Sequence, residues 1–169
     1  EPNTDSAYEL TFPNGGTIFV SMGTRGQTLQ YLLISEFGYI CKHAPEKAAE
    51  IMTGSLNSIE SNQLVVIEST AKGKDGYFHD IVMGADKNLK EGRDLTALDW
   101  KLFFFPWYLD PTYRLEGDVT ITDDMAEYFK KLKDRHGIEL SKEQKSWYIK
   151  KKVTQGEQMF QEYPSTLEE

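Results

Sequence analysis

The run Leu29-Gln30-Tyr31-Leu32-Leu33-Ile34 is apolar at almost every position. Strands of a parallel sheet that are covered on both faces show such runs, because neither face meets water. Leu64-Val65-Val66-Ile67 is a second run of this kind, and residues 100–105 are a third. Helical patterns lie between the runs, over residues 45–52 and 77–83. Strands that alternate with helices predict an α/β fold with a mostly parallel sheet and flanking helices, with the first run as a central strand.

A β-hairpin is predicted ahead of this region. Residues 8–12 and 17–21 are rich in β-prone side chains, and Pro13-Asn14-Gly15-Gly16 joins them. Glycine and asparagine accept the positive φ angles that tight hairpin turns require. We therefore expect two short antiparallel strands before the parallel sheet.

The pattern becomes helical in the last third of the chain. Residues 123–136 and 141–153 carry helix formers and mixed charge, which predicts two helices. Gly137 is the expected stop of the first helix, and Ser141 with Gln144 three residues later resembles a capping box.

Length and composition limit the domain organisation. With 169 residues, 39% of them hydrophobic, the chain can form one core with a small helical appendage. We expect an α/β core over residues 1–109, a helical subdomain over 110–155 and a linker over 156–169. The single cysteine, Cys41, excludes an internal disulfide.

Charge and hydropathy limit the partners and the compartment. The net charge is -8, which argues against a surface that coats DNA through bulk electrostatics. Any contact with DNA should therefore be local, and the run Lys150-Lys151-Lys152 is a minor candidate for it beside its ordinary interpretation as a solvated helix face. No signal peptide and no apolar run long enough to span a bilayer are present. These features predict a cytoplasmic location without a membrane segment.

Polar residues follow the first apolar run directly, at Ser35-Glu36. Ligands of open α/β sheets bind beyond the carboxyl ends of the strands. A carboxylate on the end of a rigid strand can orient and deprotonate a water molecule aimed at a phosphorus atom, so Glu36 is the candidate catalytic base. The alternative is that Glu36 only marks where a strand reaches solvent.

The second run ends in Glu68-Ser69-Thr70-Ala71-Lys72-Gly73. Hydroxyl donors at the end of a neighbouring strand can sense a γ-phosphate and move a loop when it leaves. An ordinary strand-to-loop turn is the alternative for this segment. Two such strand ends on neighbouring strands together favour a ligand site.

These residues carry a specific resemblance. The chain resembles the ATPase domain of bacteriophage large terminase subunits, on an ordered set of segments that spans nearly the whole sequence. The segments are Arg25-Gly26, Leu32-Leu33-Ile34-Ser35-Glu36-Phe37-Gly38, Ile67-Glu68-Ser69-Thr70-Ala71, Phe103-Phe104-Phe105-Pro106-Trp107 and Gln161-Glu162-Tyr163-Pro164-Ser165-Thr166.

The resemblance implies a partial P-loop NTPase of the ASCE type, with ATP and Mg²⁺ as cofactors. Glu36 then takes the role of the Walker B catalytic glutamate. Ser35 stands where the usual Walker B pattern has a magnesium-associated aspartate, and a hydroxyl is a weaker partner for the second shell of Mg²⁺. Ser69, Thr70 and Ala71 match the coupling motif, and Ser35, Ser69 and Thr70 are the expected nucleotide contacts.

The pattern Gly-x-x-x-x-Gly-Lys-[Ser/Thr] of a phosphate-binding loop is absent from the 169 residues. The resemblance therefore implies an excerpt of a longer protein, running from just before Walker B toward a nuclease domain. Such an excerpt is expected to expose a hydrophobic sheet edge and face, which favours self-association.

Arg25 has two interpretations. A guanidinium before the Walker B strand can stabilise charge on the phosphoryl group, in cis or as a finger from a neighbouring subunit. The alternative is a surface arginine in a glycine-flanked loop. We carry Arg25 as a candidate catalytic residue.

The resemblance also implies the partners, which are double-stranded DNA, a small terminase subunit, a portal protein and further copies in a ring, in the cytoplasm of a bacterial host. Another ASCE-type ATPase, such as a helicase-like enzyme, and a non-catalytic α/β interaction module remain alternatives. The aromatic segment over residues 103–108 is assigned to packing. The histidines share no ligand spacing with one another or with Cys41, so a zinc site is not expected.

Overall fold

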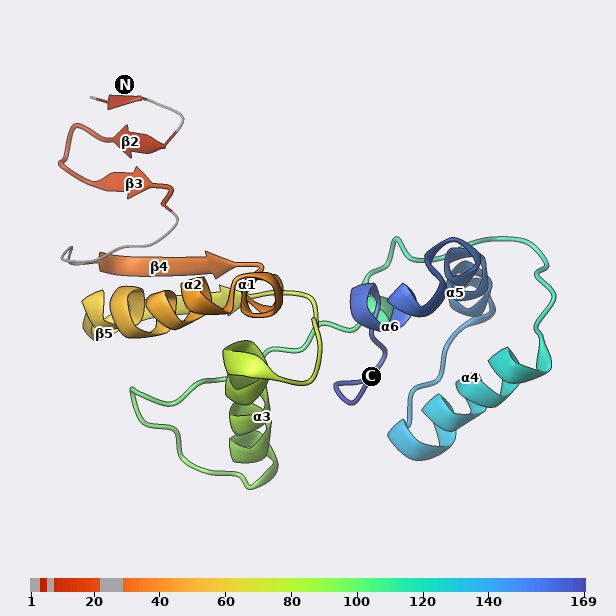
Figure 1. The fold of residues 1–169 in the computed structure, drawn as a ribbon. Coiled ribbons are helices and arrows are strands. Elements are labelled where there is room, and N and C mark those ends of the chain that lie inside the picture. The colour runs from red at the N-terminus through yellow and green to blue at the C-terminus, as the bar shows by residue number, and fades with distance from the viewer. Residues whose placement is uncertain (1–3, 6–7, 22–28) are drawn as a thin grey trace.

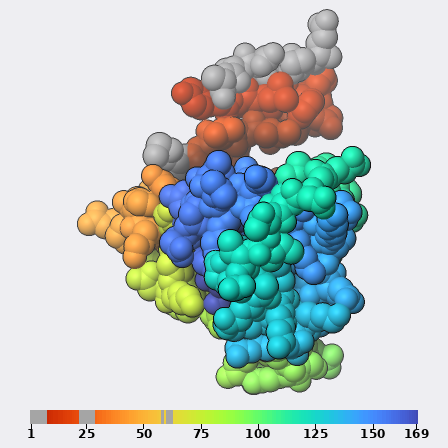
Figure 2. Space-filling model, turned by 90° about the vertical axis from the view of Figure 1, so that its right-hand side faces the viewer, coloured from red at the N-terminus to blue at the C-terminus, as the bar shows by residue number. Residues whose placement is uncertain are grey.

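The computed structural model describes residues 4–5, 8–21 and 29–169, which fold into a mixed α/β structure (Figure 1). A small antiparallel sheet comes first, followed by a parallel two-stranded sheet with its helices and then by a group of helices. We call residues 29–90 the α/β part and residues 107–169 the helical part. Figure 2 shows the antiparallel sheet at one end of the molecule and the helices of the helical part across the face toward the viewer.

The antiparallel sheet has the order β1-β2-β3. Its strands are β1 (Thr4–Asp5), β2 (Glu9–Thr11) and β3 (Thr17–Phe19). The β2–β3 pair confirms the predicted hairpin, although each strand is shorter than expected. The turn closes because Gly15 adopts a φ of 85° and the Phe12 amide donates to the Gly16 carbonyl at 2.8 Å.

The parallel sheet pairs β4 (Leu29–Ser35) with β5 (Ile59–Glu68). Parallel strands need a crossover connection, and helices supply it here. They are α1 (Phe37–His43), α2 (Pro45–Glu50), the π-helix η1 (Ile51–Ser55) and the 3-10 helix η2 (Leu56–Ser58). The predicted parallel pairing of the first two apolar runs is thereby confirmed.

One face of this sheet packs on the crossover helices. Ile34 is buried there together with Phe37, Ala48 and Ile51. The other face points away from them, because successive side chains on a strand alternate between faces. Tyr31 on that face is 77% exposed and Leu33 is 64% exposed. The expectation of a central strand covered on both faces is therefore wrong for the described part of the chain.

The third predicted strand does not form. Helix α3 (Gly76–Lys90) runs beyond the predicted residues 77–83, and residues 100–106 follow in an irregular conformation. Phe103 and Phe105 are both largely exposed, so the packing expected of the aromatic segment holds at Trp107 but fails at these two positions. No strand in the described ranges lies beside this segment to provide ladder hydrogen bonds.

The helical part builds a second core. Its helices are η3 (Trp107–Leu109), α4 (Asp123–His136), α5 (Lys142–Gln155), η4 (Gly156–Gln158) and α6 (Met159–Glu162). The buried residues of this core are Trp107, Met125, Phe129, Leu132, Leu140, Tyr148 and Met159. Both predicted helix boundaries are confirmed, since Gly137 is left-handed after α4 and Ser141 forms a capping box with Gln144 before α5.

The end of the chain belongs to this core and differs from the predicted linker. Ser165 is 1% exposed and accepts a hydrogen bond from the Trp107 indole at 2.8 Å. The Tyr128 hydroxyl contacts the Ser165 hydroxyl at 2.7 Å and donates to the Glu169 carboxylate at 2.8 Å. Because these groups are satisfied inside the core, residues 163–169 are held against η3 and α4. Across the described ranges, no helix has the length and apolar content that crossing a membrane would require.

Candidate functional site

The carboxyl ends of β4 and β5 meet at one edge of the parallel sheet. Ser35, the last residue of β4, is the register partner of Glu68, the last residue of β5. The segments that follow, Glu36 and Ser69-Thr70, therefore leave the sheet side by side. This arrangement joins the two strand ends that the sequence singled out, and it is the position at which α/β sheets bind ligands.

Glu36 occupies the sharp turn between β4 and α1. Its φ of 55° and ψ of 38° are left-handed, and it is the one non-glycine residue with a positive φ in the described part of the chain. Left-handed backbone costs a residue with a Cβ atom about 1–2 kcal/mol. The Glu36 side chain is exposed and does not cap α1, nor does it form any hydrogen bond or ion pair within the described ranges. Its carboxylate is therefore accessible to a ligand or a water molecule.

Ser35 has a hydrogen-bond partner, Glu68, for which the sequence indicated no separate role. Its hydroxyl donates a hydrogen bond to the Glu68 carboxylate across the two strands. Besides Glu36, a second carboxylate thus lies close to this strand end, beside Ser35. Ser35 is the position at which this chain has a serine and the usual Walker B pattern has an aspartate. The signal for Glu68 was its place at the end of the second apolar run, but its closeness to Ser35 follows only from the register.

Ser69 connects the end of β5 to the start of α1. The Gly38 amide donates to the Ser69 hydroxyl at 3.1 Å. The approach is close, because a Cβ atom added at Gly38 would lie 2.9 Å from the Ser69 hydroxyl and 2.9 Å from the Thr70 carbonyl oxygen. Position 38 therefore requires glycine, for a steric reason that only the folded structure shows.

Thr70 and Ala71 lead from the sheet toward the helical part. Thr70 is half-buried and Ala71 is exposed. Beyond them, the Lys72 ammonium donates to the Gln161 side chain at 3.1 Å, and the Lys74 ammonium donates to the Glu168 carbonyl at 3.3 Å. The strand end is thus in contact with the last residues of the chain.

Two other predictions concern Arg25 and the lysine run Lys150-Lys151-Lys152. Arg25 lies outside the described residues. Of the lysine run, Lys151 lies over the ring of Tyr163 at 5.2 Å and Lys152 over the ring of Phe160 at 5.5 Å. These two ammonium groups therefore sit against aromatic side chains of the same part of the protein.

Metal ligation at the strand ends is limited to two carboxylates. Across the described ranges, no group of three or more His, Cys, Asp and Glu side chains is placed to hold a metal ion. Glu36 and Glu68 follow neighbouring strands, and the Ser35 hydroxyl is hydrogen-bonded to Glu68, so the oxygen donors at the strand ends are these three side chains. Mg²⁺ suits such a set, because it is commonly bound by one or two carboxylates together with phosphate oxygens and water.

No protein-family model, curated protein or solved structure matches this chain. The chemistry open to the strand ends therefore has to follow from their own side chains. The strand ends carry an exposed carboxylate on a strained turn, a carboxylate–hydroxyl pair and a hydroxyl bonded to the start of a helix. These groups can accept hydrogen bonds from water and can bind a cation.

Proposed function

We propose that this chain is part of the ATPase of a phage-type large terminase subunit, a P-loop NTPase of the ASCE class. In this proposal ATP hydrolysis drives double-stranded DNA into a procapsid. The main support is the meeting of Ser35-Glu36 with Glu68-Ser69-Thr70 at the carboxyl ends of two register-paired parallel strands. The ordered resemblance of the sequence to that family is the reason for proposing ATP hydrolysis coupled to DNA packaging as the reaction.

Glu36 is the proposed general base. Its carboxylate is exposed and carries no ion pair in the described part of the chain, so it can accept a hydrogen bond from a water molecule. A general base must lie within hydrogen-bond reach of the proton that it takes. The left-handed turn at Glu36 presents the carboxylate at the sheet edge, where the γ-phosphate of a bound nucleotide would lie.

Glu68 and Ser35 are the proposed residues on the Mg²⁺ side of the site. The ion, when bound, neutralises charge on the β- and γ-phosphates. Glu68 supplies the carboxylate that a serine at position 35 does not, and the Ser35 hydroxyl orients that carboxylate by hydrogen bonding. The phosphates also require a glycine-rich loop, which residues 1–169 do not contain.

Ser69 and Thr70 are the proposed coupling residues. The bond from Gly38 to Ser69 fixes the first turn of α1, and that turn begins directly after Glu36. A movement of Ser69 would therefore alter how the first turn of α1 holds Glu36, the proposed general base. In the other direction along the chain, Lys72 and Lys74 connect the same segment to the helical part.

The test is the substitution Glu36→Gln in the full-length gene product. Because the amide cannot accept the proton of the attacking water, we expect ATP hydrolysis per subunit to fall by about a hundredfold to ten-thousandfold. Binding of a fluorescent ATP analogue should persist, since the side chain keeps its size. Glu46→Gln, at an exposed position of α2, is the matched control and should hydrolyse ATP at the parent rate. Parent-like hydrolysis by the Glu36→Gln variant would refute the assignment.

The exposed sheet face favours one alternative function. Tyr31, Leu33, Leu64 and Val66 form an apolar surface of the kind that interaction modules use. A non-catalytic module would bind no nucleotide in the full-length protein. A helicase-like ATPase would separate DNA strands, whereas a packaging motor would place DNA inside procapsids, where added nuclease cannot reach it.

A further inference from the structure

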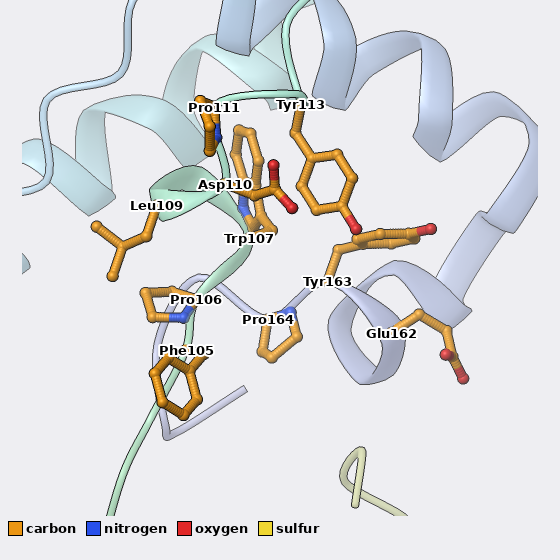
Figure 3. A pocket seen from close by; sticks show the side chains of 10 residues that line it. All are labelled: Phe105, Pro106, Trp107, Leu109, Asp110, Pro111, Tyr113, Glu162, Tyr163 and Pro164. Atoms are coloured by element: carbon orange, nitrogen blue, oxygen red, sulfur yellow. The ribbon is translucent and has the colours of Figure 1, made fainter.

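A cavity of about 450 Å³ lies in the helical part, between η3 and the segment that follows α6 (Figure 3). Its volume is within the range of sites that hold a small ligand or a few residues of a peptide. None of its lining residues belongs to the strand ends of β4 and β5. The cavity is therefore separate from the proposed nucleotide site.

The aromatic wall of this cavity is held rigidly by the core. Tyr113 stacks on Trp147, with ring centroids 4.5 Å apart and an angle of 17° between the planes. Tyr163 meets the same Tyr113 ring edge-on at 5.6 Å. Trp107 is fixed behind them by its hydrogen bond to Ser165. Such locked rings bind a ligand without first losing side-chain freedom.

The rim of the cavity carries apolar side chains that remain in solvent. Phe105 is 80% exposed and Leu109 is 65% exposed, although both line the cavity. Apolar surface beside a formed cavity is typical of sites that accept a partner side chain.

The charges that line the cavity are both negative. Asp110 and Glu162 contribute carboxylates, and no Lys, Arg or His is among the lining residues. In the view of Figure 3, the Asp110 carboxylate lies between the rings of Trp107 and Tyr113, and Glu162 lies at the margin. Hydrogen bonds from the Thr112 hydroxyl and amide lower the pKa of Asp110, so it is anionic at neutral pH. The cavity therefore complements a cation.

We propose that this cavity docks a short segment of a partner protein, with an arginine side chain against Asp110 and an apolar neighbour on Phe105 and Leu109, while Glu162 adds negative charge at the margin. Arginine fits better than lysine, because its planar guanidinium stacks on aromatic rings and donates to carboxylates at the same time. The net charge of -8 also favours a basic partner.

The probe is a synthetic library of short peptides with a fixed central arginine and random neighbours, compared with the same library built on citrulline. Citrulline keeps the shape of the side chain but removes its charge. We expect the chain to select arginine peptides with apolar neighbours, and to bind the citrulline versions about tenfold more weakly or worse, by the loss of a charge-assisted hydrogen bond. Equal binding of the two libraries, or selection of none, overturns the proposal.

Variants of the chain locate the binding. Glu162→Gln and Leu109→Ser alter exposed side chains, and each should weaken the selected peptide while leaving the thermal unfolding temperature unchanged. Asp110→Asn should weaken it further, but this variant also loses a turn contact to Thr112. Glu46→Gln, in the α/β part, is the control and should bind as the parent does. Undiminished binding by Glu162→Gln and Leu109→Ser would overturn the proposal. The proposal would also be overturned if the chain associated with itself and both substitutions abolished that association, because a second copy of the chain would then occupy the cavity.

Discussion

Glu36 combines a strained backbone with the proposed role of general base. Residues with left-handed backbone and a Cβ atom persist where the surrounding structure holds them, and they cluster at functional sites. Here β4 and α1 hold Glu36 from both sides, and the Ser69 hydroxyl fixes the first turn of α1. The turn thereby places a carboxylate at the sheet edge at a cost in stability.

Glu36→Gly and Glu36→Ala separate these two properties. Both remove the carboxylate, but only alanine keeps the Cβ atom that left-handed backbone disfavours. We expect the glycine variant to be about 1 kcal/mol more stable than the alanine variant in urea unfolding. In the full-length protein, both should be as inactive in ATP hydrolysis as Glu36→Gln. Equal stability of the two variants would show that the turn is not strained.

Gly38→Ala and Gly84→Ala are matched substitutions with opposite expected effects on stability. A methyl group at position 38 would clash with the Ser69 hydroxyl and with the rigid Thr70 carbonyl, whereas nothing lies within 4 Å of a methyl group at position 84. Gly38→Ala should therefore lose about 1–3 kcal/mol of unfolding free energy. Gly84→Ala, in the interior of α3, should gain about 0.5–1 kcal/mol through helix propensity. Urea unfolding of both variants measures the contrast, and a stabilised Gly38→Ala would refute the close contact.

At the level of elements, the hydrogen-bonded tyrosines of α4 and α5 hold the end of the chain. The Tyr148 hydroxyl donates to the Tyr128 hydroxyl at 3.2 Å, and Tyr128 in turn contacts Ser165 and Glu169. Burial raises the pKa of Tyr148 to about 12, and burial also raises the pKa of Tyr128 well above its usual value of 10.0. The folded protein therefore keeps these protons at a pH where the unfolded chain loses them.

The stability of the protein should consequently fall in alkaline solution. Below pH 10 both states hold the tyrosine protons, and the stabilisation is complete. Between about pH 10 and 12 the unfolded chain ionises first, so the free energy of unfolding decreases as pH rises. Thermal unfolding across this range measures the slope, which Tyr148→Phe should make shallower. Tyr31→Phe, at an exposed position, is the control. A slope that Tyr148→Phe leaves unchanged would contradict the role of this side chain.

Elements whose signals are local were predictable from the sequence. The hairpin turn at Gly15 and the capping box at Ser141 depend on residues a few positions apart, and the structure contains both. The third strand failed because a strand also needs a neighbour, and residues 100–105 have none in the described ranges. The same limit applies to the site. Ser35, Glu36 and Ser69 could be chosen as strand ends, but the roles of Gly38 and Glu68 depend on register, which no local pattern contains.

On the scale of the whole molecule, the uncovered face of the parallel sheet is the largest departure from an ordinary α/β domain. Tyr31 is the register partner of Leu64, and Leu33 is the register partner of Val66. These cross-strand pairs form one apolar surface that the crossover helices leave open. Parallel sheets are almost always covered on both faces, so we expect another protein surface to pack on this apolar face.

Self-association of the chain through this face is the expected result. Sedimentation velocity should show an average mass that rises with concentration, and Leu33→Lys should lower it by placing a charge on the surface. Leu98→Lys adds the same charge at a position outside the sheet that is 93% exposed, and it should leave the association as it was. An average mass that stays at the monomer value at every concentration would contradict self-association through this face of the sheet.

The contacts between Lys72 and Gln161 and between Lys74 and the Glu168 carbonyl have a further consequence. Both are polar, and water can replace each of them at a net cost of about 0.5–1.5 kcal/mol. Gly73 lies between the two lysines with a φ of 89°, a backbone region that only glycine enters freely. The helical part, which is joined to α3 through residues 91–106, can therefore separate from the segment after β5 at the cost of these polar contacts, and neither hydrophobic core is divided because the two cores share no residue.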